Sequence, residues 1–190
     1  MTVGLVLAGG RSQRFGEDKA LYKLSKRSQP NVLQACNLLI GLTGKVLVAA
    51  NSQNASQIRC LTAEHPQITV IADLAQWRGQ GPLAALLTAA ETSEAEDCLM
   101  IAVDYVNLIG PILEKLLMYS SAYIRTPLHN HYCVAHLPLI QPILAGLLSS
   151  GEHRLQIYEQ EVAAVPVAIS NEQLMLNLNQ RAATHYENSN

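Results

Sequence analysis

Charged residues are scarce in this sequence of 190 residues, since Asp, Glu, Lys and Arg make up only 15% of it. An average globular chain has about 25%. Hydrophobic residues make up 49%, which argues against an intrinsically disordered chain. The formal net charge of −2 gives no sign of binding to nucleic acid or to an anionic membrane surface. The low charge also suggests that a partner covers part of the surface.

Cysteine is sparse as well, and the four cysteines form no close pair and no zinc-type spacing. We expect them to be reduced thiols. No apolar run approaches the roughly 20 residues that a membrane helix needs, and the apolar start lacks the basic flank of a signal peptide. Linkers, internal repeats and low-complexity tracts are also absent. We therefore predict one domain over residues 1–190, located in the cytoplasm. The cysteines are Cys36, Cys60, Cys98 and Cys133.

The sequence alternates between strand-like and helical patterns. Short apolar runs predict strands, and apolar residues at helical spacing between these runs predict helices. This order indicates parallel βαβ units, and therefore an α/β fold with helices on both faces of a mainly parallel sheet. The chain after residue 104 is less regular. The predicted strands are 3–8, 45–50, 68–72, 98–103 and one near 132–136, and the predicted helices are 31–42, 55–63, 83–92, 111–119 and 140–148.

A basic, glycine-rich stretch, "LVLAGGRSQRFGEDKAL" over residues 5–21, follows the first predicted strand. In an open parallel sheet, ligands bind beyond the carboxyl ends of the strands. Glycines let backbone N–H groups approach phosphate oxygens, while Arg11, Arg14 and Lys19 supply positive charge. The stretch is not a P-loop, because Lys19 precedes Ala20 rather than Ser or Thr, and it lacks the G-x-G-x-x-G pattern. From composition alone, a solvated glycine-rich turn remains the alternative to a phosphate site.

Asp104 ends the fourth apolar run, "CLMIAVD". Transfer of a nucleotide to a phosphate brings two anions together, and a divalent cation, usually Mg²⁺, neutralises the charge that develops. A carboxylate at a strand end close to the phosphates is suited to hold this ion. Position alone leaves a second interpretation open, in which Asp104 caps a helix or stabilises a turn.

The opening stretch resembles the LAGG-x-S-x-R-x-G-x-DKAL pattern of the molybdenum cofactor guanylyltransferases, the molybdopterin-guanine dinucleotide biosynthesis protein A family, and matches it from Leu7 to Leu21 without a gap. Further similar segments are "GPLAALL" from Gly81, "GEHRLQIY" from Gly151 and "LNLN" from Leu176. The resemblance implies a Rossmann-like nucleotidyltransferase fold. It also implies transfer of GMP from GTP to the phosphate of molybdopterin or molybdenum cofactor, with release of pyrophosphate and Mg²⁺ as cofactor. Other molybdenum cofactor proteins are candidate partners.

The resemblance assigns roles to individual residues. It implies that about 1–105 bind the nucleotide and about 106–190 bind the acceptor. Lys19, Arg14 and Asp104 are the implied catalytic residues, and Asp104 is the implied metal ligand. The implied nucleotide-binding residues are Leu7, Ala8, Gly9, Gly10, Lys19, Asn51, Asp73 and Asp104.

Two segments depart from the family pattern. The family reads Cys-Asp-x-Pro where this chain has Val103-Asp104-Tyr105-Val106, and Thr-Pro-Glu where this chain has residues 180–182. Two alternatives follow: a related enzyme with another base or acceptor, such as a molybdenum cofactor cytidylyltransferase, or a non-catalytic nucleotide-binding protein. The cytidylyltransferase branch typically reads Leu-Ala-Ala-Gly in the opening motif, so "LAGG" and "GPLA" here favour guanine.

Two further groups have two interpretations each. His129, His131 and Cys133 alternate at period two and would share one face of a strand, as ligands of a transition metal do. The family has a histidine at the position of His131 in a metal-free strand beside the acceptor cleft, and we favour that interpretation. Trp77 and Arg78 precede the Gly81-Pro82 turn, where they would either contact a base or cover the core.

Overall fold

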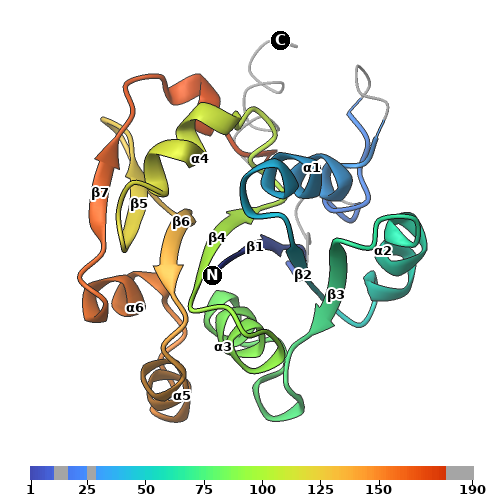
Figure 1. The fold of residues 1–190 in the computed structure, drawn as a ribbon, viewed down its shortest axis with the longest axis horizontal. Helices are drawn as coiled ribbons and strands as arrows, with labels where there is room; N and C mark the ends of the chain where they lie inside the picture. Colours follow the sequence, from blue (N-terminus) through green and yellow to red (C-terminus); the bar gives the residue numbers. More distant parts are fainter. Residues whose placement is uncertain (11–16, 25–28, 179–190) are drawn as a thin grey trace, which may run out of the picture.

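The structure is a computed structural model that describes residues 1–10, 17–24 and 29–178. Seven strands form one sheet in the order β3-β2-β1-β4-β6-β5-β7 (Figure 1). The strands are β1 (Thr2–Leu7), β2 (Val46–Ala50), β3 (Ile68–Ala72), β4 (Asp97–Ala102), β5 (Ala122–Arg125), β6 (Asn130–Pro138) and β7 (Val165–Ala168). The helices are α1 (Asn31–Thr43), α2 (Ala55–Thr62), α3 (Pro82–Thr92), α4 (Gly110–Leu116), α5 (Gln141–Ser149) and α6 (Leu155–Glu161), with short 3₁₀ turns η1 (Ala75–Trp77) and η2 (Glu172–Met175).

The first four strands are parallel, and their carboxyl ends lie level with one another. Leu7 of β1 pairs with Ala49 of β2 and with Ala102 of β4, and β3 continues the same register beside β2. β6 is antiparallel to both β4 and β5, whereas β7 is parallel to β5. The predicted mainly parallel sheet is therefore confirmed, and the loops after β1 to β4 meet at one edge.

Helices cover both faces of the sheet, as the alternating pattern predicted (Figure 1). Because side chains alternate along a strand, strands β1 to β6 each contribute to two hydrophobic clusters. Residues of α1, α2 and α4 pack in the first cluster, on one face. Residues of α3, α5 and α6 pack in the second cluster, on the other face. Gly4 shows how closely α1 approaches β1, since a Cβ there would lie 3.0 Å from the Leu39 Cβ.

The sequence patterns located the longer elements but missed three short ones: β5, β7 and α6. β5 and β7 have four residues each and α6 has seven, which is too short for a clear period. β7 also contains Pro166, and proline in a strand is confined to edges and bulges. β7 is the edge strand of the sheet.

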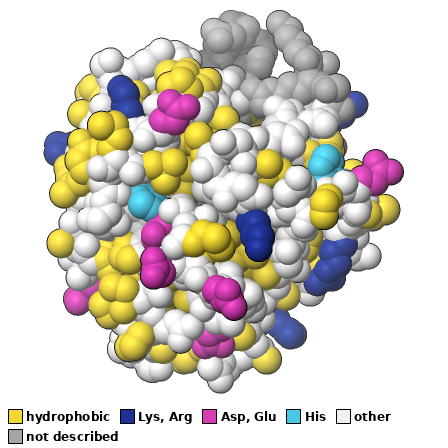
Figure 2. All heavy atoms as spheres, viewed as in Figure 1, with side chains coloured by type: hydrophobic (Ala, Val, Ile, Leu, Met, Phe, Trp, Pro, Cys, Tyr) yellow, Lys and Arg dark blue, Asp and Glu magenta, His cyan; other side chains and the backbone are white. Residues whose placement is uncertain are grey.

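Few charged side chains appear on the face shown in Figure 2, where hydrophobic and uncharged polar groups separate them. This agrees with the 15% of charged residues in the sequence. Over the described ranges, no helix has both the length and the apolar character that crossing a membrane requires.

Candidate active site

The edge where β1 to β4 end brings together most of the residues singled out from the sequence. The turn 7–10 follows β1, Asn51 follows β2, Asp73 follows β3, and Asp104 lies two residues beyond β4. Since the strand order is β3-β2-β1-β4, the glycine turn is central, with Asp73 to one side and Asp104 to the other. Ligands of open α/β sheets bind at such an edge.

Two asparagines hold the glycine turn in place. The Asn54 side-chain amide donates to the Ala8 carbonyl over 2.8 Å, and the Asn51 amide donates to the Gly9 carbonyl over 3.3 Å. The Ala8 N–H donates to the carbonyl of Ala49 on the neighbouring strand over 2.8 Å. With these carbonyls bonded inward, the turn is fixed relative to β2.

Asn54 and Asp18 were not among the predicted site residues, yet they organise the site. Asn54 is 1% exposed, and its side-chain NH₂ also donates to Asp18 Oδ2 over 2.9 Å. Asp18 Oδ1 accepts the N–H of Ala20 over 2.8 Å. These bonds fix the backbone on either side of Lys19. The repeat of asparagine at 51 and 54, and the place of Asp18 inside the "DKAL" match, were the available signals.

Lys19 and Asp104 form an ion pair, although 85 residues separate them in the sequence. Lys19 Nζ lies 3.4 Å from Asp104 Oδ2, and the two side chains are only 12% and 18% exposed. The backbone of each is anchored: the Lys19 carbonyl accepts from the Asn31 amide over 2.9 Å, and the Asp104 carbonyl accepts from the Leu178 N–H over 3.1 Å. A fixed cation and a fixed carboxylate therefore meet beside the glycine turn.

Asp73 organises the loop between β3 and α3. Its Oδ2 accepts the Gly79 N–H over 2.8 Å. Gly79 and Gly81 have φ values of 73° and 77°, which disfavour any residue other than glycine. In the same loop, the Trp77 indole N–H and the Gln80 side-chain oxygen are buried without a hydrogen-bond partner in the described structure. The loop thus offers one donor and one acceptor next to the edge.

The carboxylates at this edge of the sheet are suited to a divalent cation that also binds phosphate oxygens. Within residues 1–10, 17–24 and 29–178, no three His, Cys, Asp or Glu side chains are arranged to hold a metal ion. Both oxygens of Asp18 accept hydrogen bonds, and Asp73 holds the loop after β3 through the Gly79 N–H. Asp104, beside the glycine turn and Lys19, is therefore the best-placed carboxylate. Mg²⁺ typically takes one or two carboxylates and completes its coordination with substrate phosphates and water. Asp104 fits that donor set.

The histidines near β6 are arranged differently from the expected single face. The pairing of β5 with β6 moves from Tyr123–Ala135 directly to Ile124–His131, so a bulge interrupts the alternation. His131 is 5% exposed and contacts the Tyr105 hydroxyl and the Thr126 hydroxyl, each at 3.2 Å. Burial lowers the pKa of His131. His129 precedes β6, and Cys133 packs in the second hydrophobic cluster.

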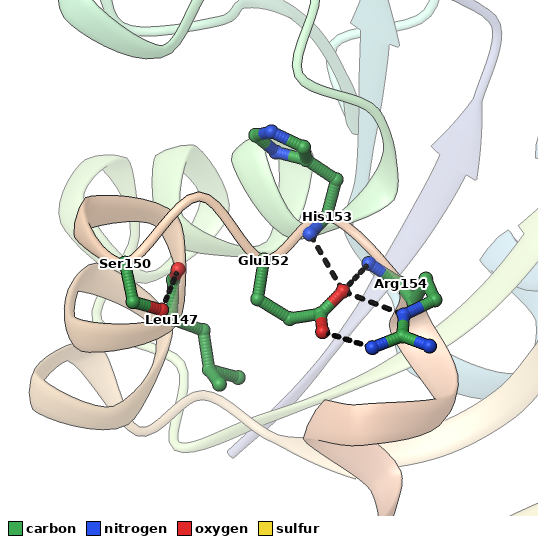
Figure 3. A network of polar contacts seen from close by, with 5 residues as sticks. All are labelled: Leu147, Ser150, Glu152, His153 and Arg154. Atoms are coloured by element: carbon green, nitrogen blue, oxygen red, sulfur yellow. Dashed lines mark hydrogen bonds and ion pairs between the residues drawn. The ribbon is translucent and has the colours of Figure 1, made fainter.

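A charged cluster lies between α5 and α6, in the segment that resembles Gly-x-Arg-Arg (Figure 3). Arg154 donates to the Glu152 carboxylate through Nε at 2.9 Å and Nη2 at 2.5 Å, and the N–H groups of His153 and Arg154 also donate to it. These bonds lower the pKa of Glu152 to about 2. The Arg154 side chain is 72% exposed, so its guanidinium is accessible to an anion.

Two predicted features lie outside the described residues. Arg14 and Arg11 belong to 11–16, and Asn179 with residues 180–182 belongs to 179–190. The phosphate-binding role expected of Arg14 therefore stays a prediction. The other predicted residues, from Leu7 to Gly10 together with Lys19, Asn51, Asp73 and Asp104, are within the described ranges.

The fold and this edge are those of a nucleotidyltransferase. Residues 4–163 match the family model described as the MobA-like NTP transferase domain, and the chain belongs to that family. Relatives in it are named molybdenum cofactor guanylyltransferases, and enzymes of this family typically need a divalent metal. A probable molybdenum cofactor guanylyltransferase of Bacillus cereus is 30% identical over 162 residues, which cover 83% of this chain and 74% of the relative.

Solved structures are similar over nearly the whole chain. A molybdopterin-guanine dinucleotide biosynthesis protein A from Archaeoglobus fulgidus has a TM-score of 0.70 and 16% identity, covering 99% of this chain and 100% of the other. A nucleotidyl transferase from Methanothermobacter thermautotroptrophicus also has a TM-score of 0.70, with 15% identity and coverage of 100% and 99%. At these identities, the likeness establishes the fold.

Proposed function

We propose that this enzyme transfers GMP from GTP to the terminal phosphate of molybdopterin or its molybdenum form. A phosphate oxygen of the acceptor attacks the α-phosphorus of GTP in line. The new oxygen–phosphorus bond forms as the bond to the β-phosphate oxygen breaks, and pyrophosphate leaves. No covalent enzyme intermediate is required.

The observation that carries the proposal is the Lys19–Asp104 pair beside the glycine turn. Backbone N–H groups of residues 7–10 would bind the nucleotide, and Asn51 and Asp73 would position it from the neighbouring strand ends. Lys19 would exchange its 3.4 Å contact with Asp104 for a phosphate oxygen. Catalysis of this kind depends on positioning and charge stabilisation rather than on a protein nucleophile.

Asp104 would hold Mg²⁺ together with the phosphates of GTP. A divalent cation held there would offset the negative charge that develops on the phosphates in the transition state. Asp104 contributes a carboxylate fixed at the end of β4, and Lys19 contributes a second positive charge. Arg14 is proposed to face the triphosphate.

The experiment that tests the proposal begins with the four nucleoside triphosphates. We expect Mg²⁺-dependent binding of GTP in a calorimetric titration, and release of pyrophosphate when molybdopterin is added. Strongest binding of CTP with turnover would instead favour the cytidylyltransferase alternative. Tight GTP binding with no pyrophosphate release from any acceptor would favour a non-catalytic nucleotide-binding protein and contradict the proposal.

A further inference from the structure

Glu159 is a buried carboxyl group without a partner. It lies on α6 and is 2% exposed, and neither Oε1 nor Oε2 has a hydrogen-bond partner in the part of the chain that the structure describes. Burial raises the pKa of Glu159 to about 9. Leaving both oxygens of a buried carboxyl group unpaired is costly, and an apolar side chain would fill the same place at lower cost. This cost points to a ligand that completes the hydrogen bonds.

The surroundings place this carboxyl group beyond β4, away from the glycine turn. α6 packs against β6, on the face of the sheet that α3 and α5 also cover (Figure 1). Burial is the main cause of the raised pKa values of Cys133 on β6 and Tyr123 on β5, and Glu159 makes a smaller contribution to both, so Glu159 lies within electrostatic reach of both side chains. The charge of Asp104 also raises the pKa of the Cys133 thiol, so Asp104 lies within electrostatic reach of the same side chain. Glu159 is therefore on the acceptor side of the proposed metal ligand.

Tyr123, which lies within electrostatic reach of Glu159, forms a partly buried aromatic pair with Tyr132. The rings of Tyr123 and Tyr132 have centroids 5.1 Å apart and are tilted by 51°, and both side chains are partly buried. The Asn130 amide donates to the Tyr132 hydroxyl over 3.0 Å, which orients that ring. Aromatic side chains of this kind stack on planar heterocycles.

We propose that Glu159, Tyr123 and Tyr132 form the subsite for the pterin ring of the acceptor, an inference that rests on the proposed function. The aminopyrimidinone edge of a pterin carries a ring N–H next to an exocyclic amino group. Glu159 is protonated in the unliganded protein, so binding would release this proton to the solvent, and the resulting carboxylate accepts from the two adjacent donors at once. The tyrosine rings would cover the flat face of the pterin, after a side-chain rotation that opens the carboxyl group to the ligand.

Fluorescence titration with 6-hydroxymethylpterin tests this subsite in the full-length protein. Glu159→Met fills the site with an unbranched apolar chain, Glu159→Gln keeps one acceptor, and Glu161→Gln is the matched control on the exposed side of the same helix. We expect Glu159→Met to weaken pterin binding by about 10-fold or more, and Glu159→Gln to be intermediate. The thermal midpoint of Glu159→Met should equal or exceed that of the wild type, and GTP binding should change by less than about twofold.

The possible outcomes separate this inference from the proposed function. If the wild type binds the pterin and Glu159→Met binds it equally well, the subsite is wrong and the proposed acceptor stands. If Glu159→Met unfolds at lower temperature and loses GTP and pterin together, its role is structural and the subsite is wrong. If the wild type binds GTP but no pterin, the proposed acceptor and the subsite are both overturned.

Discussion

The two sides of the sheet use their polar groups differently. On the side of β3, β2, β1 and β4, the side-chain amides of Asn51 and Asn54 donate to backbone carbonyls of the glycine turn. Asn54 also donates to the carboxylate of Asp18. Beyond β4, the buried side chains of Glu159 and Ser121 have no partner among the described residues. The glycine turn is thus organised before any ligand binds, whereas the carboxyl group of Glu159 on the acceptor side has hydrogen-bonding capacity that is not yet used.

This difference suggests a division of labour between the two sides. A preorganised turn stabilises the charge of a triphosphate without rearrangement. A subsite with unpaired polar groups gains its hydrogen bonds only when the correct ligand arrives, which favours specificity. Within the described part of the chain, the nucleotide side also has unpaired buried atoms, at Asn31, Trp77 and Gln80. Trp77 and Gln80 lie in the loop that would contact the base, where specificity is also needed.

Removing the charge of Asp104, on the nucleotide side, should have the largest effect of the predicted changes, and the effect should be on turnover. Asp104→Asn keeps the shape of the side chain but removes the proposed Mg²⁺ ligand. We expect turnover to fall by roughly 100-fold or more, about 2.7 kcal/mol, while GTP measured without metal binds nearly as before. Lys19→Ala should weaken both binding and turnover. A folded Asp104→Asn variant with near-normal turnover would show that another residue holds the metal.

The free energy of unfolding should depend on pH because of Glu159, the unpaired carboxyl group on the acceptor side. The pKa of Glu159 is raised from 4.5 to about 9, so between these values the folded state binds more protons than the unfolded state. Stability should therefore fall as pH rises through this range, with a slope of up to about 1.4 kcal/mol per pH unit. Denaturant unfolding of wild type and Glu159→Gln at several pH values measures this slope. Identical slopes in the two proteins would contradict the prediction.

Replacing Asn54 should disturb the nucleotide side in both stability and binding. Asn54→Ala removes the donor to the Ala8 carbonyl and to Asp18. We expect a loss of roughly 1–3 kcal/mol of unfolding free energy, because buried partners are left unpaired, together with weaker GTP binding. Gln53→Ala, at an exposed position in the same turn, is the control and should leave both unchanged. An Asn54→Ala variant as stable as this control would mean that the turn does not depend on the asparagine.

How far the sequence predicts the site differs between the two sides for physical reasons. That Lys19 and Asp104 lie at the same edge of the sheet was predictable, because both follow parallel strands whose carboxyl ends are at that edge. The role of Asn54 was not, because no sequence pattern shows that this loop side chain turns back to the Ala8 carbonyl. On the acceptor side, the bulge opposite Tyr123 and the seven-residue helix α6 depend on tertiary packing. The burial of Glu159 was unpredictable, since glutamate is almost never fully buried.

The preference for GTP over CTP should be a smaller effect, and it tests whether the loop at 79–81 contacts the base. We expect GTP to bind at least about 10-fold more tightly than CTP, which corresponds to about 1.4 kcal/mol. If the buried Gln80 oxygen pairs with the base, Gln80→Ala should narrow this preference without changing the Mg²⁺ dependence. Competition titrations of GTP and CTP against both proteins measure it. Equal or tighter CTP binding by the wild type would reverse the assignment of the base.

Glu152 and Arg154 should give the smallest effect on stability, because their ion pair lies at the surface. Exposed pairs contribute little to folding, so Glu152→Gln should leave the unfolding free energy nearly unchanged. The substitution removes the carboxylate that neutralises Arg154 and so leaves its guanidinium free for a phosphate. If Arg154 serves the acceptor, Glu152→Gln should bind a phosphorylated pterin a few-fold more tightly, roughly twofold to threefold, and more so at low salt. Glu161→Gln removes an acidic charge from an exposed position on α6 and controls for the change in net charge. Equal affinities of the two variants at low salt would exclude Arg154 from the acceptor site and leave that role to the groups around Glu159.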